Sequence, residues 1–193
     1  LSDGSWITPF DPASVQRPSN YVEGNAWQWA WFVPQDVEGL IELLGGEKAF
    51  ADKLNTFFSL DSGNDEDILL DLTGCIGQYA HGNEPSHHIA YLYAYVGQQW
   101  KTARLTRYIL KNFYHDQPDG IIGNEDCGQM SAWYIMSSLG FYPVFTASGQ
   151  YVLGSPLFDK VTINHENGKK FIIEAVLRGQ DRKSRRNRNH LGI

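Results

Sequence analysis

The residue types most suited to catalysis or metal binding lie between His81 and His88, in the sequence HGNEPSHH. This stretch combines a carboxylate, a side-chain amide, a hydroxyl and three imidazoles. Pro85 suits the first turn of a helix, where its missing N–H costs nothing, so we expect Asn83 and Glu84 at a helix N-terminus. Two interpretations are open at this point: a functional site, or an N-cap followed by a buried polar belt.

Two further segments place acids just before apolar helical patterns. Glu23 opens EGNAWQWAWF, which also contains Trp27 and Gln28, and the adjacent acids Glu125 and Asp126 precede another apolar run. The helix dipole favours acids in a first turn, so capping alone is an alternative explanation. If the loops at one end of an array of helical hairpins converge, however, the same acids line one pocket.

Carboxyl groups in such a pocket suit glycoside hydrolysis. One acid must stay protonated to donate to the leaving oxygen, and the other must stay ionised to act on water. A third acid with an amide can hold a hard cation, because calcium prefers oxygen ligands. The alternative is a zinc or iron site on His81, His87 and His88. Adjacent helical histidines point about 100° apart, and their spacing lacks the i, i+4 geometry of HExxH.

The surrounding pattern is helical to about residue 140 and β afterwards. Helical patterns cover residues 23–32, 36–44, 47–60, 84–95, 99–114 and 130–140. Short alternating segments at 151–153, 160–164 and 170–175 predict strands, and Asn167-Gly168 predicts a hairpin turn. The acidic stretch 61–67 lacks the glycine and glutamate placement of an EF-hand, so we interpret it as a solvated turn.

The composition is that of a globular protein: 193 residues, 42% hydrophobic and 13% aromatic. A formal charge of −6 argues against nucleic acid or an anionic membrane as the main partner. No apolar run is long enough to span a membrane. Cys75 and Cys127 allow at most one disulfide, and their spacing does not suggest a metal ribbon. The chain has no signal peptide and begins with Leu, which indicates a start inside a longer protein.

Three long blocks resemble the signature blocks of glycoside hydrolase family 92, the calcium-dependent exo-α-mannosidases, which act mostly on α-1,2 linkages. The blocks are EGNAWQWAWFVPQD (23–36), DLTGCIGQYAHGNEPSHHIAYLYAYVGQ (71–98) and GNEDCGQMSAWYIMSSLGFYPV (123–144). The segments DGSWITPFDP and GSPLFDKVTI match in the same order, so the resemblance covers Leu1 to about Ala175.

The resemblance implies a mainly α fold. Residues 1–140 would form the closing portion of an (α/α)6 toroid, and residues 141–175 the first strands of a C-terminal β-sandwich. A further N-terminal β-sandwich domain, which helps to form the pocket in the family, would lie outside this chain. Residues 176–193 form a divergent basic tail in which the strand pattern stops, as is typical of a frameshifted or mispredicted end.

The resemblance also implies a reaction: hydrolysis of terminal α-linked mannose from mannose-rich oligosaccharides or N-glycans, with inversion of configuration. Glu23 would be the general acid and Asp126 the base, with Glu125 as the alternative base. Two further sets of residues follow from the resemblance, namely calcium ligands (Gln28, Asn83, Glu84) and side chains that shape the sugar pocket (Trp27, His87, His88).

The full-length protein is expected to be secreted, periplasmic or at the cell surface. Two other functions are open for the chain as it stands. It could be a non-catalytic carbohydrate-binding fragment of such an enzyme, with the acids present but the pocket incomplete. It could also be a truncated, non-functional gene product.

Overall fold

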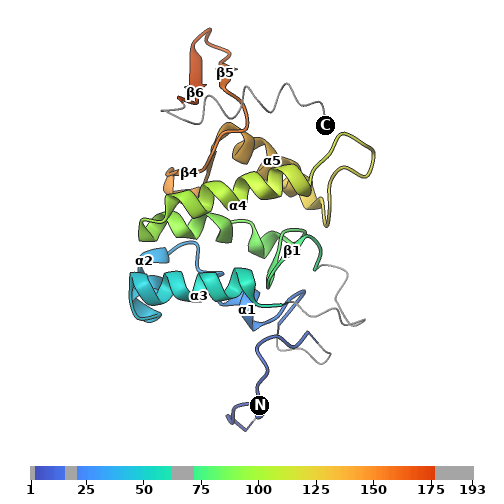
Figure 1. Cartoon of the computed structure of the whole chain (residues 1–193), viewed down its shortest axis with the longest axis vertical. Coiled ribbons are helices and arrows are strands. Elements are labelled where there is room, and N and C mark those ends of the chain that lie inside the picture. Colours follow the sequence, from blue (N-terminus) through green and yellow to red (C-terminus); the bar gives the residue numbers. More distant parts are fainter. Residues whose placement is uncertain (1–2, 16–20, 62–71, 177–193) are drawn as a thin grey trace.

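The fold is seen in a computed structural model that describes residues 3–15, 21–61 and 72–176 (Figure 1). Its α-helices are α1 (Ala26–Trp29), α2 (Val37–Leu43), α3 (Glu47–Ser59), α4 (Gln99–Asn112) and α5 (Gln129–Leu139). Its 3₁₀ helices are η1 (Glu84–Ser86), η2 (Ile89–Val96), η3 (Asp126–Gly128) and η4 (Thr146–Ser148). Its strands are β1 (Cys75–Ile76), β2 (Tyr79–Ala80), β3 (Phe141–Tyr142), β4 (Val152–Leu153), β5 (Lys160–Asn164) and β6 (Lys170–Glu174).

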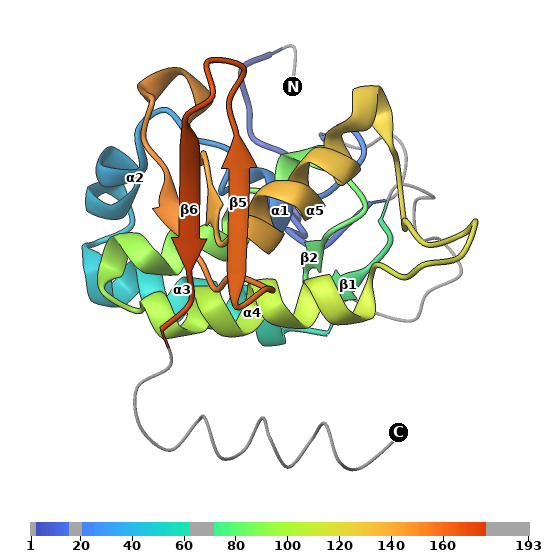
Figure 2. The same cartoon turned by 90° about the horizontal axis from the view of Figure 1, so that it is seen from above.

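The helices form stacked layers. Helices α1, α2 and α3 lie at one side in Figure 1, α4 crosses the middle, and α5 lies beyond it. Segment η2 packs between these layers, because it contacts both α3 and α4. The β5–β6 hairpin projects at the end opposite the N-terminal segment in Figure 1, and Figure 2, seen from above, shows it in front of the helices. The chain is therefore a mixture of helices and small two-stranded sheets.

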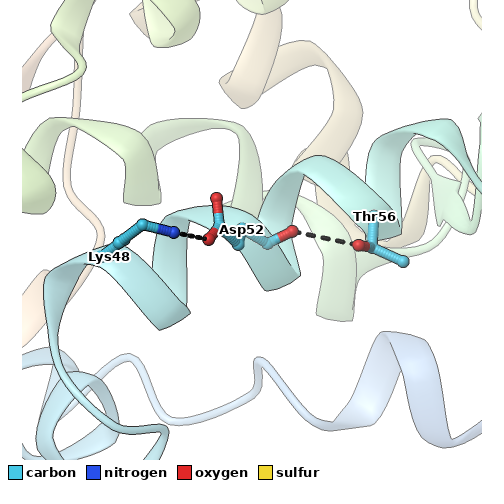
Figure 3. A network of polar contacts seen from close by, with 3 residues as sticks. All are labelled: Lys48, Asp52 and Thr56. Atoms are coloured by element: carbon cyan, nitrogen blue, oxygen red, sulfur yellow. Dashed lines mark hydrogen bonds and ion pairs between the residues drawn. The ribbon is translucent and has the colours of Figure 1, made fainter.

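Helices α2, α3, α4 and α5 confirm the expectations from periodicity. The Asp36 side chain accepts a hydrogen bond from the Gly39 N–H at 2.9 Å and so caps α2. In α3, the apolar side chains recur on one face and are buried: Phe50, Ala51, Leu54 and Phe57. Figure 3 shows the outer face of α3, where Lys48 contacts Asp52 at 2.6 Å and the Thr56 hydroxyl donates to the Asp52 carbonyl.

The helix expected over residues 84–95 is wrong in type, because the structure has two 3₁₀ segments, η1 and η2, instead. Asn83 and Glu84 do lie at the N-terminus of η1, as expected. Between the segments, His87 and His88 turn their rings to carbonyls of two different parts of the chain. Nearly all of η2 is buried, so tertiary packing rather than local propensity determines its tighter winding.

The helix expected over residues 23–32 is shorter than predicted, since α1 covers only one turn. Asn25 caps this turn and forms a capping box with Gln28, which places the start of the helix after Glu23. Two short strands, β1 and β2, were not predicted at all. Pairs of two residues give too little alternation to detect.

The predicted hairpin is confirmed. Strands β5 and β6 pair antiparallel from Lys160↔Glu174 to Asn164↔Lys170, and Gly168 closes the turn with a left-handed φ of 77°. Cys75 and Cys127 are both free and exposed. Within the described ranges, no helix is both long and apolar enough to cross a bilayer. The acidic stretch 62–67 and the tail from residue 177 lie outside the described residues.

Candidate active site

The three acid-bearing segments predicted from the sequence meet in the structure. The backbone of Gly82 crosses that of Gly123 so closely that a Cβ on Gly82 would lie 3.0 Å from the Gly123 Cα. The Asn124 N–H donates to the Gly82 carbonyl at 3.0 Å. This crossing fixes the segment that contains Glu84 beside the segment that contains Asp126.

Asn83 joins these two segments to the third. Its side chain is 3% exposed, and its Nδ2 donates to the Glu23 carbonyl at 3.0 Å. The same Nδ2 lies 3.5 Å from the Glu23 carboxylate, and the Asn83 Oδ1 lies 3.5 Å from the Nδ2 of Asn124. One buried amide thus touches residues from both of the other acid-bearing segments.

Glu23 stands in a strained conformation. Its φ of 53° is in the left-handed region, which costs a residue with a Cβ about 1–2 kcal/mol. The side chain is exposed, while the backbone carbonyl is held by Asn83. Strained residues of this kind cluster at functional sites, which adds an independent reason to single out Glu23.

Gln28 and Asn25 anchor α1 to residue 78 through a buried amide cluster. The Gln28 Oε1 accepts the Asn25 N–H at 2.6 Å, and the Gln28 Nε2 donates to the Gln78 carbonyl at 2.8 Å. The Asn25 Nδ2 donates to the Gln78 Oε1 at 2.9 Å. The predicted calcium ligand Gln28 therefore already has a structural role, since its side-chain oxygen accepts the capping hydrogen bond.

Glu125 and Asp126 differ in their surroundings. The Glu125 carboxylate accepts from the Ser131 N–H at 3.1 Å, which caps the first turn of α5. Asp126 opens η3 and is exposed, and no hydrogen bond to its carboxylate is found within the described residues. Capping, the alternative considered for both acids, thus applies to Glu125.

His87 and His88 are buried and hold separate parts of the chain. The His87 Nε2 lies 2.9 Å from the His81 carbonyl, and the His88 Nε2 lies 2.7 Å from the Trp31 carbonyl. Because carbonyls only accept, both Nε2 atoms carry the proton. Burial lowers the pKa of His87 to about 4 and also lowers the pKa of His88. Both rings are therefore neutral at neutral pH.

Trp27 lines a hollow of about 370 Å³ together with Phe10, Tyr21 and Trp29. The ammonium group of Lys53 lies 5.0 Å from the centre of the Trp27 ring, a cation–π distance. None of the predicted catalytic acids lines this hollow. Its aromatic faces are nevertheless the kind that stack on sugars, so a role for Trp27 in sugar binding stays a prediction.

The alternative of a transition-metal site on three histidines finds no support. In the part of the chain that the structure describes, no three His, Cys, Asp or Glu side chains are grouped so that they could hold a metal. The Nε2 atoms of His87 and His88 are directed at carbonyls, and both ring nitrogens of His81 contact tyrosine hydroxyls at 2.7 Å. This finding does not concern a calcium site in which side-chain amides supply some of the oxygen ligands.

Sequence reasoning missed two members of the cluster, Asn124 and Gln78. Asn124 had a signal, because Gly123-Asn124-Glu125 repeats Gly82-Asn83-Glu84. The two glycines allow the backbone crossing, and the two asparagines then face one another. Gln78 had no comparable signal, since its role depends on a contact fifty residues away in the chain, with Gln28.

A known family contains all of these segments. The model of the Glycosyl hydrolase family 92 catalytic domain matches residues 1–190. The chain belongs to glycoside hydrolase family 92. The matched range runs past Ala175, where the resemblance of the sequence blocks ends.

Solved family 92 enzymes share this fold. An α-mannosidase from Bacteroides thetaiotaomicron, solved in complex with mannoimidazole, is 42% identical with a TM-score of 0.82, over 90% of this chain and 23% of its own. An inverting mannosidase from the same organism is 38% identical with a TM-score of 0.73, over 90% of this chain and 24% of its own.

A curated relative is described as an uncharacterized secreted glycosidase from Arthroderma benhamiae. It is 30% identical over 143 residues, which are 74% of this chain and 16% of the relative. The chain thus spans only 16% of this relative and less than a quarter of each of the two solved enzymes.

Proposed function

We propose that this chain provides part of the active site of an exo-α-mannosidase that removes terminal α-linked mannose, chiefly α-1,2-linked, from mannose-rich glycans. The observation that carries the proposal is the convergence of the Glu23, Glu84 and Asp126 segments on Asn83. Membership of family 92 and the likeness to two mannosidases at 42% and 38% identity support it.

Glu23 is the proposed general acid and Asp126 the proposed base. In a single displacement, Glu23 donates a proton to the leaving glycosidic oxygen while Asp126 removes a proton from the attacking water, which inverts the anomeric carbon. The capping bond of Glu125 to Ser131 favours Asp126 over Glu125, because the carboxylate of Asp126 is not committed to a helix terminus.

Gln28, Asn83 and Glu84 are the proposed calcium ligands. All three offer oxygen atoms, which calcium prefers as ligands. Helix α1, which contains Gln28, packs against η1, which contains Glu84. Binding through Gln28 would share an oxygen that accepts the Asn25 N–H. Bound calcium would supply Lewis-acid and template chemistry to the sugar hydroxyls.

The sugar pocket is proposed to include Trp27, His87 and His88. The two histidines act by holding the backbone of the acid-bearing segments, because their rings are buried and contact the His81 and Trp31 carbonyls. As neutral rings they add no positive charge near the carboxylates. Trp27 is partly exposed, and its indole ring is of the kind that stacks on the apolar side of a pyranose.

The complete site is proposed to need sequence outside this chain. Residues 1–140 would close an (α/α)6 toroid, residues 141–175 would begin a β-sandwich, and an N-terminal domain would complete the pocket. The lengths of the two solved mannosidases support this view, since the chain matches 23% and 24% of them. Secretion, or location in the periplasm or at the cell surface, is proposed from the name of the curated relative. We use "family-length protein" for the polypeptide that carries this chain together with the remaining length of such relatives.

The acid assignment is tested with Glu23→Gln in the family-length protein, using α-1,2-mannobiose and a dinitrophenyl α-mannoside. A general acid is needed for the sugar leaving group but not for dinitrophenolate, which leaves without a proton. Glu23→Gln should therefore lose roughly 100-fold or more on mannobiose and much less on the aryl substrate. Asp126→Asn should lose activity on both substrates. Glu42 is an exposed acid on α2, and Glu42→Gln should keep its activity on both. Equal losses by Glu23→Gln on both substrates would contradict the assignment.

A second candidate function is a carbohydrate-binding fragment without catalysis. The observation that favours it is the short span of the chain relative to its relatives. Calorimetric titration of the 193-residue chain with mannobiose, together with an assay for released mannose, separates the two. Binding without release would favour the fragment.

A further inference from the structure

A continuous series of hydrogen bonds links Tyr79, His81, Tyr114 and Met130. The Tyr79 hydroxyl lies 2.7 Å from the His81 Nδ1, and the His81 Nε2 lies 2.7 Å from the Tyr114 hydroxyl. The Tyr114 hydroxyl in turn donates to the Met130 carbonyl at 3.3 Å. Tyr79 and His81 are fully buried, so no solvent competes for the contact between them, whereas the two contacts of the Tyr114 hydroxyl are partly buried.

The Met130 carbonyl, at one end of this series, determines which group donates in each hydrogen bond. The Met130 carbonyl only accepts, so the single hydroxyl proton of Tyr114 points towards it. The His81 Nε2 must then donate to Tyr114, and its Nδ1 must accept from Tyr79. All four groups are satisfied in this one arrangement, which fixes the orientation of the His81 ring.

This series of hydrogen bonds connects the two sides of the proposed site. His81 directly precedes Gly82, Asn83 and Glu84 in the sequence. Met130 lies in the first turn of α5. Asp126 lies in η3, the segment immediately before α5. Tyr114 also forms a backbone bridge with Ile121, at the start of the loop that leads to Asp126.

We propose that His81 and Tyr114 are positioning residues that set the spacing between the Asn83–Glu84 segment and Asp126. The inference rests on the proposed glycosidase function, because a positioning role is meaningful only if these segments act together. The effect of the two side chains is exerted through the backbone, above all on the hydrogen bond from the Asn124 N–H to the carbonyl of Gly82, the residue that follows His81.

Tyr91 provides a matched control. Like Tyr114, it is a tyrosine whose ring packs on Trp133 and whose hydroxyl donates a hydrogen bond to α5. The acceptor of the Tyr91 hydroxyl is the Ser137 Oγ, at 2.7 Å in the buried core. Ser137 lies about two turns beyond the start of α5, away from Asp126. Tyr91→Phe therefore removes a comparable hydrogen bond without touching the link between the two segments.

The experiment compares Tyr114→Phe, Tyr91→Phe, His81→Leu and His81→Gln in the family-length protein. We expect Tyr114→Phe and His81→Leu to lower kcat by roughly 10- to 100-fold, because misplacement by about 1 Å is enough for such a loss. KM should change little, and His81→Gln, which keeps a donor for Tyr114, should recover part of kcat. Tyr91→Phe should leave kcat within a factor of about two. Equal kcat values for Tyr114→Phe and Tyr91→Phe would overturn the proposal.

A second measurement separates this proposal from the function on which it rests. Amide hydrogen exchange of Asn124 reports directly on its bond to the Gly82 carbonyl, whether or not mannose is released. We expect Tyr114→Phe to accelerate this exchange about tenfold and Tyr91→Phe to leave it unchanged. Loss of mannose release in the unmodified protein would contradict the function alone. Unchanged exchange in Tyr114→Phe would overturn the positioning role.

Discussion

The crossing of Gly82 over Gly123 makes the sharpest prediction about the site. Gly123 has a left-handed φ of 73°, and a Cβ added there would overlap the Cα of Gly82 and lie 2.7 Å from its carbonyl carbon. Both obstacles are backbone atoms, so no side-chain rotation can relieve them. Gly123→Ala must therefore push the two segments apart.

The expected cost has two parts. The left-handed conformation costs alanine about 1–2 kcal/mol. Forcing a methyl group into a filled site adds about 1–3 kcal/mol. Gly97→Ala isolates the first part, because Gly97 has a similar φ of 68° and nothing within 4 Å of an added Cβ. The difference between the two variants is thus about 1–3 kcal/mol.

Thermal unfolding of the two variants measures this difference. Gly97→Ala should lower Tm modestly, and Gly123→Ala should lower it by several degrees more. In the family-length protein, only Gly123→Ala should also reduce turnover, because it displaces Asp126 relative to Asn83. If Gly123→Ala is no less stable and no less active than Gly97→Ala, the backbone crossing does not hold the site together as described.

Three further predictions concern acid, calcium and the capping residue. Unfolded His87 binds a proton near pH 6.5 and folded His87 only near 4, so its contribution to stability is complete above pH 6.5 and is lost as the pH falls towards 4. At pH 5.5 this loss is about 1 kcal/mol. His87→Gln should flatten the dependence of Tm on pH, and an unchanged slope would contradict a buried, neutral His87. Calcium at about a hundred times its Kd should stabilise the chain by roughly 2.7 kcal/mol against chelator, whereas a cooperative melt indifferent to calcium would contradict the ligand set. Glu125→Ala should lower stability by about 1 kcal/mol and Asp126→Asn by much less, with the larger loss of turnover in Asp126→Asn; the reverse order would make Glu125 the base.

Long amphipathic helices and the late hairpin could be predicted from the sequence, because their signals are local. Examples of such local signals are the spacing of the apolar residues in α3 and the Asn167-Gly168 turn of the β5–β6 hairpin. The 3₁₀ winding of η2 could not be predicted, since its apolar run fits a buried helix of either kind. The tighter form follows from contacts with α3 and α4, which lie outside any local window.

The candidate site was predictable in its residue types but not in its connections. Three acid-bearing segments could be found, and their convergence could be expected if the helical hairpins stack. That Asn83 links them, and that Glu125 caps α5 while Asp126 does not, depends on the path of the backbone after Gly82 and Gly123. The chain of Tyr79, His81 and Tyr114 spans more than thirty residues and has no local signature.

The most direct test of the account is the anomeric form of the first sugar released. Proton NMR can follow mannobiose hydrolysis by the family-length protein in the presence of calcium, before the product mutarotates. A general acid at Glu23 and a base at Asp126 act in one displacement, so the account predicts β-mannose as the first product. Initial release of α-mannose would contradict this pairing of carboxylates, and no release of mannose would contradict the proposed activity.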